Sequence, residues 1–341
     1  MEFSTCQFLW YLVFLFSMFA YAALDGFDIG VGLVHPFIKG DQERRICLNA
    51  IGPVWDSNSL WVIIAIGSLM AGFPEAFATL LSTLYLPMMI LIFGYVYRAV
   101  AIEFRSKRDS MRWRLAWDVV FASASYLLAV GLGIALANLI VGLPLQENGT
   151  VISGIGYLFS PYALLLGLFA ISLFMLHGNL YLYMKTAGNL HIHLYSLLKK
   201  NYCFFVIAWI AMNVVTIIEK PYVAELVLSH PIFFLLQCVG IISVIIMPVL
   251  FKKQKEEWAF LSSCGVILSL VVSYALGTYP NIIRSTVNQA YSLTIYNASS
   301  SHLTLSILLG IACLGVPLFF AYVIATYKVF RGKVEINQMS Y

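Results

Sequence analysis

Five polar residues interrupt two long apolar stretches near the start of the sequence: Asp25, Asp28, Asp56, Asn58 and Ser59. An ionisable side chain inside a membrane span is costly and usually serves a function there. Asp25 and Asp28 are three residues apart, so they share one face of a helix. Carboxyl and hydroxyl groups placed in this way can take up protons, or can line a path for a cation or another substrate.

A structural explanation also exists for these acids. Asp25 and Asp28 could be an interfacial pair that meets water at the end of a helix. Pro53 is suited to the first position of a helix, which places Asp56 in the first turn. An acid in the first turn interacts favourably with the helix dipole. The dipole does not explain the neighbouring polar run Ser57–Ser59. We therefore favour a functional role for Asp56.

Small and aromatic residues surround the acids. Gly26 and Gly30 are four residues apart, a small-x-x-x-small spacing that lets another helix come close. Trp55 and Trp61 flank the second polar run, and tryptophan favours the membrane interface. We expect the glycines and both indoles to form structural or subunit contacts.

Histidine offers few candidates for a cofactor site. Of six histidines, only His177 lies clearly within an apolar stretch, so no bis-histidine haem site is indicated. A buried hydrogen-bonding or relay role fits His177 better. The sequence has no nucleotide-binding loop, H-E-x-x-H zinc site, G-x-S-x-G elbow or C-x-x-C pair, so we expect no metal site and no soluble-enzyme chemistry.

The elements that hold these residues are membrane helices. With 61% hydrophobic and 11% charged residues, the chain is too apolar for a soluble globule. A bilayer core of about 30 Å requires about 20 apolar residues per helix. Nine such stretches occur, at residues 8–34, 53–73, 76–97, 116–141, 157–184, 203–218, 230–251, 258–277 and 304–328. We predict an all-α polytopic membrane protein with nine transmembrane helices in a single integral membrane domain, residues 1–341, surrounded by membrane lipid and with no nucleic-acid partner.

The basic residues predict the orientation of the chain. If the N-terminus lies outside, 18 of the 20 Lys and Arg residues fall in the inner loops and the C-terminal tail, which is then cytoplasmic. Only Lys220 and Arg284 remain outside. In this orientation Asp25, Asp28 and Asp56 all lie toward the cytoplasmic side. The largest inner loop is predicted to begin at Arg98, directly after the third apolar stretch.

Two motifs resemble a known family. Leu24–Gly32 (LDGFDIGVG) and Gly52–Trp61 (GPVWDSNSLW) resemble subunit II of the cytochrome bd-type quinol oxidases, including the cyanide-insensitive branch. Shorter stretches extend the resemblance over nearly the whole chain: Glu103–Lys107, Leu176–Asn179 with Lys185 and Thr186, Tyr291–Thr294 and Ala298–Ser301.

The resemblance implies an architecture and a set of partners. It implies two four-helix bundles, about residues 1–145 and 150–280, plus a peripheral ninth helix at about 300–330. A homologous subunit I would hold haems b and d, so this chain would have no haem ligands and no complete active site of its own. The family also implies a quinone in a hydrophobic pocket, room for a small single-helix subunit, and a place in the respiratory chain of the bacterial cytoplasmic (inner) membrane.

The resemblance assigns roles to the acids. The family's proton-route aspartate falls on Asp56 and its first-helix acids on Asp25 and Asp28. Ser57 and Ser59 depart from the family motif, which has Gly and Glu at these two positions. We expect a non-haem oxidase subunit that supports assembly and delivers cytoplasmic protons to the oxygen-reducing haem of subunit I, with Asn58 holding water or a carboxylate.

Two other classes of protein stay open as alternatives. A secondary transporter would show inverted repeats and a site at the membrane midplane, whereas these acids lie toward one face and nine helices do not divide into equal halves. A purely structural membrane scaffold would leave every acid at an interface.

Overall fold

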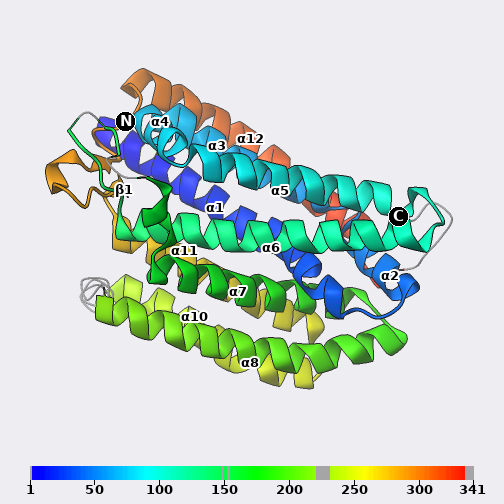
Figure 1. Cartoon of the computed structure of the whole chain (residues 1–341). Helices are drawn as coiled ribbons and strands as arrows, with labels where there is room; N and C mark the ends of the chain where they lie inside the picture. The colour runs from blue at the N-terminus through cyan, green and yellow to red at the C-terminus, as the bar shows by residue number, and fades with distance from the viewer. Residues whose placement is uncertain (1, 148, 152–153, 220–230, 335–341) are drawn as a thin grey trace.

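The computed structural model describes residues 2–147, 149–151, 154–219 and 231–334, and long helices running side by side dominate these ranges (Figure 1). The long helices are α1 (Phe3–Val34), α3 (Trp55–Gly72), α5 (Tyr85–Phe104), α6 (Met111–Val141), α7 (Pro161–Lys185), α8 (Gly188–Glu219), α10 (Pro231–Lys252), α11 (Glu256–Thr278) and α12 (His302–Val329). The shorter elements are η1 (His35–Phe37), α2 (Asp41–Ile51), α4 (Pro74–Thr83), η2 (Arg105–Lys107), η3 (Ile155–Phe159), β1 (Asn281–Ile283), η4 (Gln289–Tyr291) and β2 (Leu293–Thr294).

Length and composition mark most of these helices as membrane spans. Among the described residues, 8 helices are long and apolar enough to cross a bilayer. The pair α2 and α3, bent by 50°, is a ninth candidate if it counts as one span. Large apolar side chains also cover the outer surface: on α12, Leu314 is 79% and Leu318 76% exposed. An all-helical membrane protein with eight to nine candidate spans is therefore confirmed.

The helix α1 lies at the centre of the packing. It contacts α3, α6, α7, α11 and α12, while α7 also packs against α6, α8 and α11. The closest approach is at Gly30, where a Cβ atom would lie 1.9 Å from the backbone oxygen of Phe174 and 2.7 Å from the nitrogen of Gly178. Glycine at residue 30 thus permits the contact between α1 and α7. The last helix, α12, lies on the outside of α1 and α3.

The two ends of the helix bundle differ in chemistry. At one end lie the N-terminus, α4 and the antiparallel pair of β1 and β2 (Figure 1). The other end, which we call the basic end, holds η1, α2, η2 and the start of α6. Arg and Lys residues of the predicted inner loops gather at this basic end.

The third predicted span is wrong in its boundaries. The sequence predicted residues 76–97, but the helix breaks at Leu84, so α4 ends at Thr83 and α5 begins at Tyr85. In Figure 1, α4 is seen nearly end-on while α5 runs along the bundle. Because α5 extends to Phe104, Arg98 lies inside a membrane helix and is 1% exposed, rather than in a loop. The hydropathy pattern ended the span too early because it met a charge.

The sixth predicted span, residues 203–218, is also too short. Helix α8 begins at Gly188, and its first turns contain the lysines that interrupt the apolar run. Long Lys side chains can lie along a helix and place their charge at the interface, so they do not end it. Lys220, one of the two basic residues predicted outside, lies beyond the described residues.

Candidate functional site

Helix α1 buries both of its acids. Asp25 and Asp28 are each 0% exposed, although both are ionisable. They lie within the helix, with about two further turns between Asp28 and the helix end at Val34. Such groups require polar partners, because an unpaired buried charge is very unfavourable.

Helix α3 supplies two of these partners. The Nδ2 atom of Asn58 donates a hydrogen bond to Asp28 Oδ2 at 2.8 Å. The hydroxyl oxygen of Ser59 lies 2.9 Å from Asp25 Oδ1 and 2.9 Å from the carbonyl oxygen of Trp55. Because a hydroxyl has one proton, Ser59 donates to one of these two oxygens at a time. The structure thus brings together four of the five polar residues singled out by sequence.

Helix α5 supplies a cation that sequence reasoning had placed in a loop. Arg98 Nη2 lies 2.5 Å from Asp25 Oδ1 and donates to Ser59 Oγ at 2.9 Å. Its guanidinium also lies 5.4 Å from the ring centre of Tyr95, a cation–π distance. Arg98 therefore pairs with Asp25, and both of these charged side chains are buried.

Helix α12 completes the site. The hydroxyl of Tyr327 donates to Asn58 Oδ1 at 3.0 Å, which fixes the amide so that its nitrogen faces Asp28. We call Asp25, Asp28, Asn58, Ser59, Arg98 and Tyr327 the buried cluster. Tyr327 had no signal in the sequence, because it is 269 residues away from Asn58 along the chain.

Hydrogen bonding in the buried cluster is incomplete. Within the described part of the chain, no partner is present for Asp25 Oδ2, Asp28 Oδ1, or the Nε and Nη1 atoms of Arg98. Most buried polar atoms in proteins have a partner, so several unpaired atoms in one cluster call for a physical explanation. The two carboxyl oxygens can accept a proton or a hydrogen bond from water, whereas the two guanidinium nitrogens can only donate to water.

The other predicted residues of α3 lie apart from these hydrogen bonds. Asp56 is exposed in the first turn of the helix, one turn before Ser59, and Trp55 is half-buried. Trp61 is 2% exposed and packs edge-on against Phe16 and Phe319, with ring centres 5.6 and 5.0 Å away. The Trp61 ring is thus packed within this chain, and its predicted role in a structural or subunit contact stays a prediction.

The glycines of α1 and His177 also serve contacts within the chain. A Cβ atom on Gly26 would lie 2.8 Å from the Phe174 ring, so Gly26 faces α7, as Gly30 does. His177 Nε2 donates to the carbonyl oxygen of Ala23 at 2.8 Å, and Nδ1 lies 2.7 Å from Ser263 Oγ. Both ring nitrogens of His177 are therefore occupied by protein groups.

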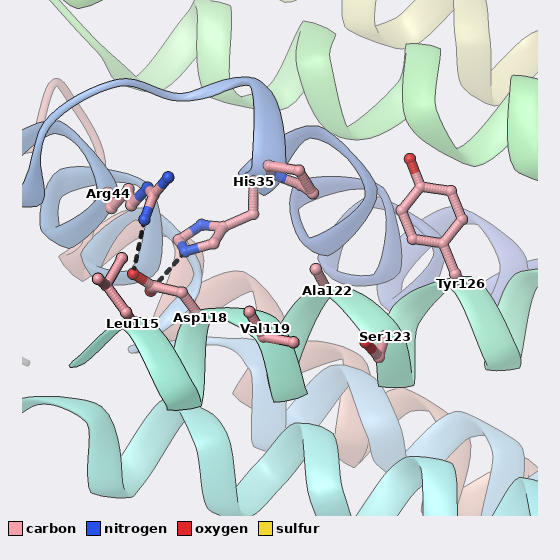
Figure 2. Close-up of a pocket in the computed structure, with 9 residues that line it drawn as sticks. His35, Arg44, Leu115, Asp118, Val119, Ala122, Ser123 and Tyr126 are labelled. Atoms are coloured by element: carbon pink, nitrogen blue, oxygen red, sulfur yellow. Dashed lines mark hydrogen bonds and ion pairs between the residues drawn. The ribbon is translucent and has the colours of Figure 1, made fainter. Parts of the chain in front are cut away.

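A second set of charged residues lies about two helical turns beyond Asp28, at the basic end. The carboxylate of Asp118 on α6 accepts hydrogen bonds from His35 Nε2 at 2.7 Å and from Arg44 Nη1 at 3.0 Å (Figure 2). Arg105 adds two hydrogen bonds to the same carboxylate, at 2.6 and 3.2 Å. Each carboxylate oxygen of Asp118 therefore accepts two hydrogen bonds.

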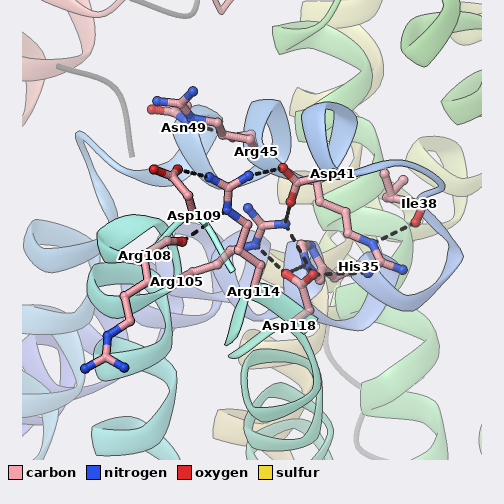
Figure 3. A network of polar contacts seen from close by, with 11 residues as sticks. His35, Ile38, Asp41, Arg45, Asn49, Arg105, Arg108, Asp109, Arg114 and Asp118 are labelled. Atoms are coloured by element: carbon pink, nitrogen blue, oxygen red, sulfur yellow. Dashed lines mark hydrogen bonds and ion pairs between the residues drawn. The ribbon is translucent and has the colours of Figure 1, made fainter. Parts of the chain in front are cut away.

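The set continues to a second carboxylate. Asp41 accepts from Arg105 at 2.8 Å and from Arg114 at 2.6 Å, and Arg114 also pairs with Asp109 at 2.8 Å (Figure 3). We call His35, Asp41, Arg44, Arg105, Asp109, Arg114 and Asp118 the basic-end network. Sequence analysis had treated its arginines only as a sign of orientation.

Comparisons with known proteins decide the family. The sequence profile described as "Cytochrome bd terminal oxidase subunit II" matches residues 6–330. The chain belongs to this family. It is thus a subunit of a terminal oxidase complex whose partner is subunit I, and the predicted resemblance is confirmed.

Individual relatives agree with this assignment over nearly the full length. The chain is 26% identical over 364 residues to cytochrome bd-I ubiquinol oxidase subunit 2 of Escherichia coli (strain K12), covering 98% of this chain and 96% of the relative. It is 28% identical over 330 residues to cytochrome bd ubiquinol oxidase subunit 2 of Bacillus subtilis (strain 168), covering 96% of each.

A solved structure shares the fold. The structure of bd oxidase from Geobacillus thermodenitrificans contains a chain that matches with a TM-score of 0.79. The match covers 96% of this chain and 98% of that chain at 16% sequence identity. At this identity the match shows that the two chains share a fold.

Proposed function

We propose that this subunit II is the non-haem subunit of a membrane quinol:oxygen oxidoreductase, in which it stabilises the complex and leads protons toward the haem-bearing subunit I. Family membership and the ubiquinol oxidase names of both relatives support the reaction class. When bound in the partner subunit, haems supply the electron transfer and oxygen chemistry. This chain contributes proton-carrying side chains.

The charge balance of the buried cluster is the observation on which the proton role rests. Asp25 and Asp28 supply two negative charges when both are ionised, and Arg98 supplies one positive charge. The cluster would then carry one unbalanced negative charge, which is unfavourable at this depth, so the pair of acids can keep one proton. Asp28 is the natural carrier, because its direct partner is the neutral amide of Asn58.

Ser59 offers a connection from the surface to the acids. Its hydroxyl is partly exposed and reaches both Asp25 and Arg98. A hydroxyl group donates one hydrogen bond and accepts others, so it can pass a proton. Asp56, exposed one turn earlier on α3, would collect protons from solvent. The family motif has Glu at the position of Ser59. In this chain the hydroxyl of Ser59 would pass protons where the family has that acid.

The positive-inside rule supports the direction of transfer. It predicts that the basic end faces the cytoplasm of a bacterial cell, so protons would enter from that side. Quinol would release its protons outside, which makes the overall reaction electrogenic.

A structural role for the buried cluster is the competing hypothesis. Its hydrogen bonds join α1, α3, α5 and α12, and so they could serve only to hold these helices together. Ion pairs and amide contacts of this kind fix how helices are arranged even when they contribute little net stability.

The variant Asp56→Asn, in the complex purified with subunit I, tests the outer end of the route. We expect oxygen consumption per haem to fall several-fold while haem content stays at the wild-type level. The matched control is Asp109→Asn, an exposed acid at the basic end whose side chain is fully open to solvent. Equal oxygen consumption in both variants would mean that Asp56 carries no protons and only stabilises the start of its helix through the helix dipole.

A further inference from the structure

A groove of about 610 Å³ opens beside α6 at the basic end, bounded by η1 and α2 (Figure 2). The proposed proton route does not use it, since none of its lining residues belongs to the buried cluster. The groove has a polar end at Arg44 and an apolar wall on α6. A ligand that fits it must therefore have two chemically different parts.

The apolar wall follows the helix toward the membrane interior. Leu115, Val119, Ala122 and Tyr126 line the groove at intervals of four, three and four residues, so they form one stripe on α6. The stripe is about 16 Å long, at 1.5 Å per residue. Leu115 is 45% and Val119 64% exposed although both are apolar. A stripe of this kind on a membrane helix suits a hydrocarbon chain.

The polar end presents a fixed cation. Arg44 donates from Nε to the carbonyl oxygen of Ile38 and from Nη1 to Asp118 Oδ2, both at 3.0 Å. These two contacts hold the guanidinium plane, and its remaining nitrogen, Nη2, makes no hydrogen bond to the described residues. In Figure 2 the side chain of Arg44 lies at the same end of the groove as His35 and Asp118.

The surroundings of Arg44 favour an anion. Asp118, its counterion, is shared with Arg105, which makes two hydrogen bonds to the same carboxylate. Arg44 thus shares its carboxylate with Arg105, which also pairs with Asp41. Guanidinium groups bind phosphate oxygens with two parallel hydrogen bonds, and Arg44 has a donor available for such a contact.

We propose that this groove binds one anionic phospholipid, with its phosphate at Arg44 and one acyl chain along the Leu115–Tyr126 stripe of α6. A free phosphate ion would leave the apolar wall unused, and a lipid without net charge would gain less from Arg44. Basic pockets beside membrane helices on the cytoplasmic side are known to suit anionic headgroups. One phospholipid molecule would thus contact both the polar end and the apolar wall of the groove.

Native mass spectrometry of the purified oxidase complex tests the proposal, with dioleoylphosphatidylglycerol and dioleoylphosphatidylcholine as probes. We expect the wild-type complex to retain one phosphatidylglycerol with about tenfold higher affinity than phosphatidylcholine, because the choline cation of phosphatidylcholine offsets the phosphate charge that Arg44 attracts. Arg44→Gln should remove this preference. Arg112→Gln, which deletes an exposed charge in the first turn of α6, should keep it.

A second variant tests the apolar wall without disturbing the pair of Arg44 and Asp118. Ser123 is exposed and lines the groove, so Ser123→Phe should fill it and lower the affinity for both lipids several-fold. Leu127→Phe, at a 39% exposed position of α6 outside the groove, is the matched control and should bind as wild type. This pair of variants is decisive even if Arg44→Gln prevents assembly.

Four results would overturn the proposal. Equal affinity of the wild-type complex for the two lipids would remove the anionic specificity. Equal binding by Ser123→Phe and Leu127→Phe would place the lipid elsewhere. Displacement of phosphatidylglycerol by millimolar inorganic phosphate would assign Arg44 to a free anion. Displacement by equimolar ubiquinone would assign the groove to a quinone.

Discussion

The buried cluster and the basic-end network both pair aspartates with arginines but differ in how completely the carboxylate oxygens are paired; the unpaired atoms of the network are nitrogens of His35 and Arg105. In the network, Asp118 accepts hydrogen bonds from three side chains and Asp41 from two arginines. In the cluster, Asp25 contacts one arginine, Asp28 contacts only the neutral amide of Asn58, and each acid keeps an oxygen without a partner among the described residues.

The difference suggests two different uses of charge. A carboxylate held by several cations stays ionised and holds structure, because its protonation would strand buried arginines. A carboxyl group with a neutral partner and an unpaired oxygen can gain and lose a proton at lower cost. We therefore expect the network to control stability and the cluster to control proton flow, and the following predictions test that division.

The largest effect is expected at Arg98. Arg98→Met leaves the buried carboxyl of Asp25 without its cation, which should destabilise the complex by about 3–5 kcal/mol and abolish most oxygen consumption. The double variant Asp25→Leu with Arg98→Met replaces the ion pair by apolar groups and should recover most of the thermal stability. Oxygen consumption per haem should stay low, because hydrocarbon side chains do not pass protons. Recovery of both quantities would make the pair purely structural.

A somewhat smaller effect on stability is expected at Arg105 of the network. Arg105→Gln removes the buried cation between Asp118 and Asp41, while Arg44 and His35 still contact Asp118. Thermal unfolding of the complex should show a loss of about 2–3 kcal/mol. Oxygen consumption per haem in the surviving complex should remain within about twofold of wild type. A selective loss of oxygen consumption with unchanged stability would contradict the assignment of the network to structure.

Tyr327→Phe should act more weakly and on the cluster. It deletes one hydroxyl and leaves Asn58 Oδ1 without its donor, at a cost of about 1 kcal/mol. We expect a few-fold decrease in oxygen consumption, because the amide that faces Asp28 is no longer fixed. Tyr322→Phe, at a 55% exposed position of the same helix, should be neutral. Equal rates of oxygen consumption in the two variants would mean that the Tyr327 hydroxyl has no role in proton transfer.

The smallest effect is expected from Ser59→Ala. The hydroxyl bridges Asp25 and Arg98, but these two groups also contact each other directly at 2.5 Å. Oxygen consumption should fall about twofold with no measurable change in stability, which is the typical range for a single partly exposed hydrogen bond. A loss as large as that of Arg98→Met would mean that Ser59 is the main connection to solvent.

Sequence patterns predict the helices and the acids of this protein well, for a clear physical reason. A span needs about 20 apolar residues, and charges inside such a stretch stand out, so Asp25 and Asp28 are visible from sequence alone. The same rule hides Arg98, because a charge near the end of an apolar run is taken as the start of a loop. The helix break at Leu84 likewise falls inside the stretch that was predicted as one span, residues 76–97.

Partners from distant parts of the chain are the features that sequence does not predict. Tyr327 looks like an ordinary interfacial tyrosine of the last helix until the fold places it on Asn58. Asp118 lies within the predicted fourth span, yet its partners His35, Arg44 and Arg105 come from two other loops. Pairing between such segments depends on how helices pack, and neither hydropathy nor spacing contains that information.

The most direct test of the proton role is Asp28→Asn in the assembled complex. The amide oxygen of the new side chain can still accept from Asn58, so haem content and thermal unfolding should stay close to wild type. Because an amide cannot carry the proton, oxygen consumption per haem should fall by about tenfold or more, and Asp28→Glu should restore part of it. Wild-type oxygen consumption in a fully assembled Asp28→Asn complex would contradict the account.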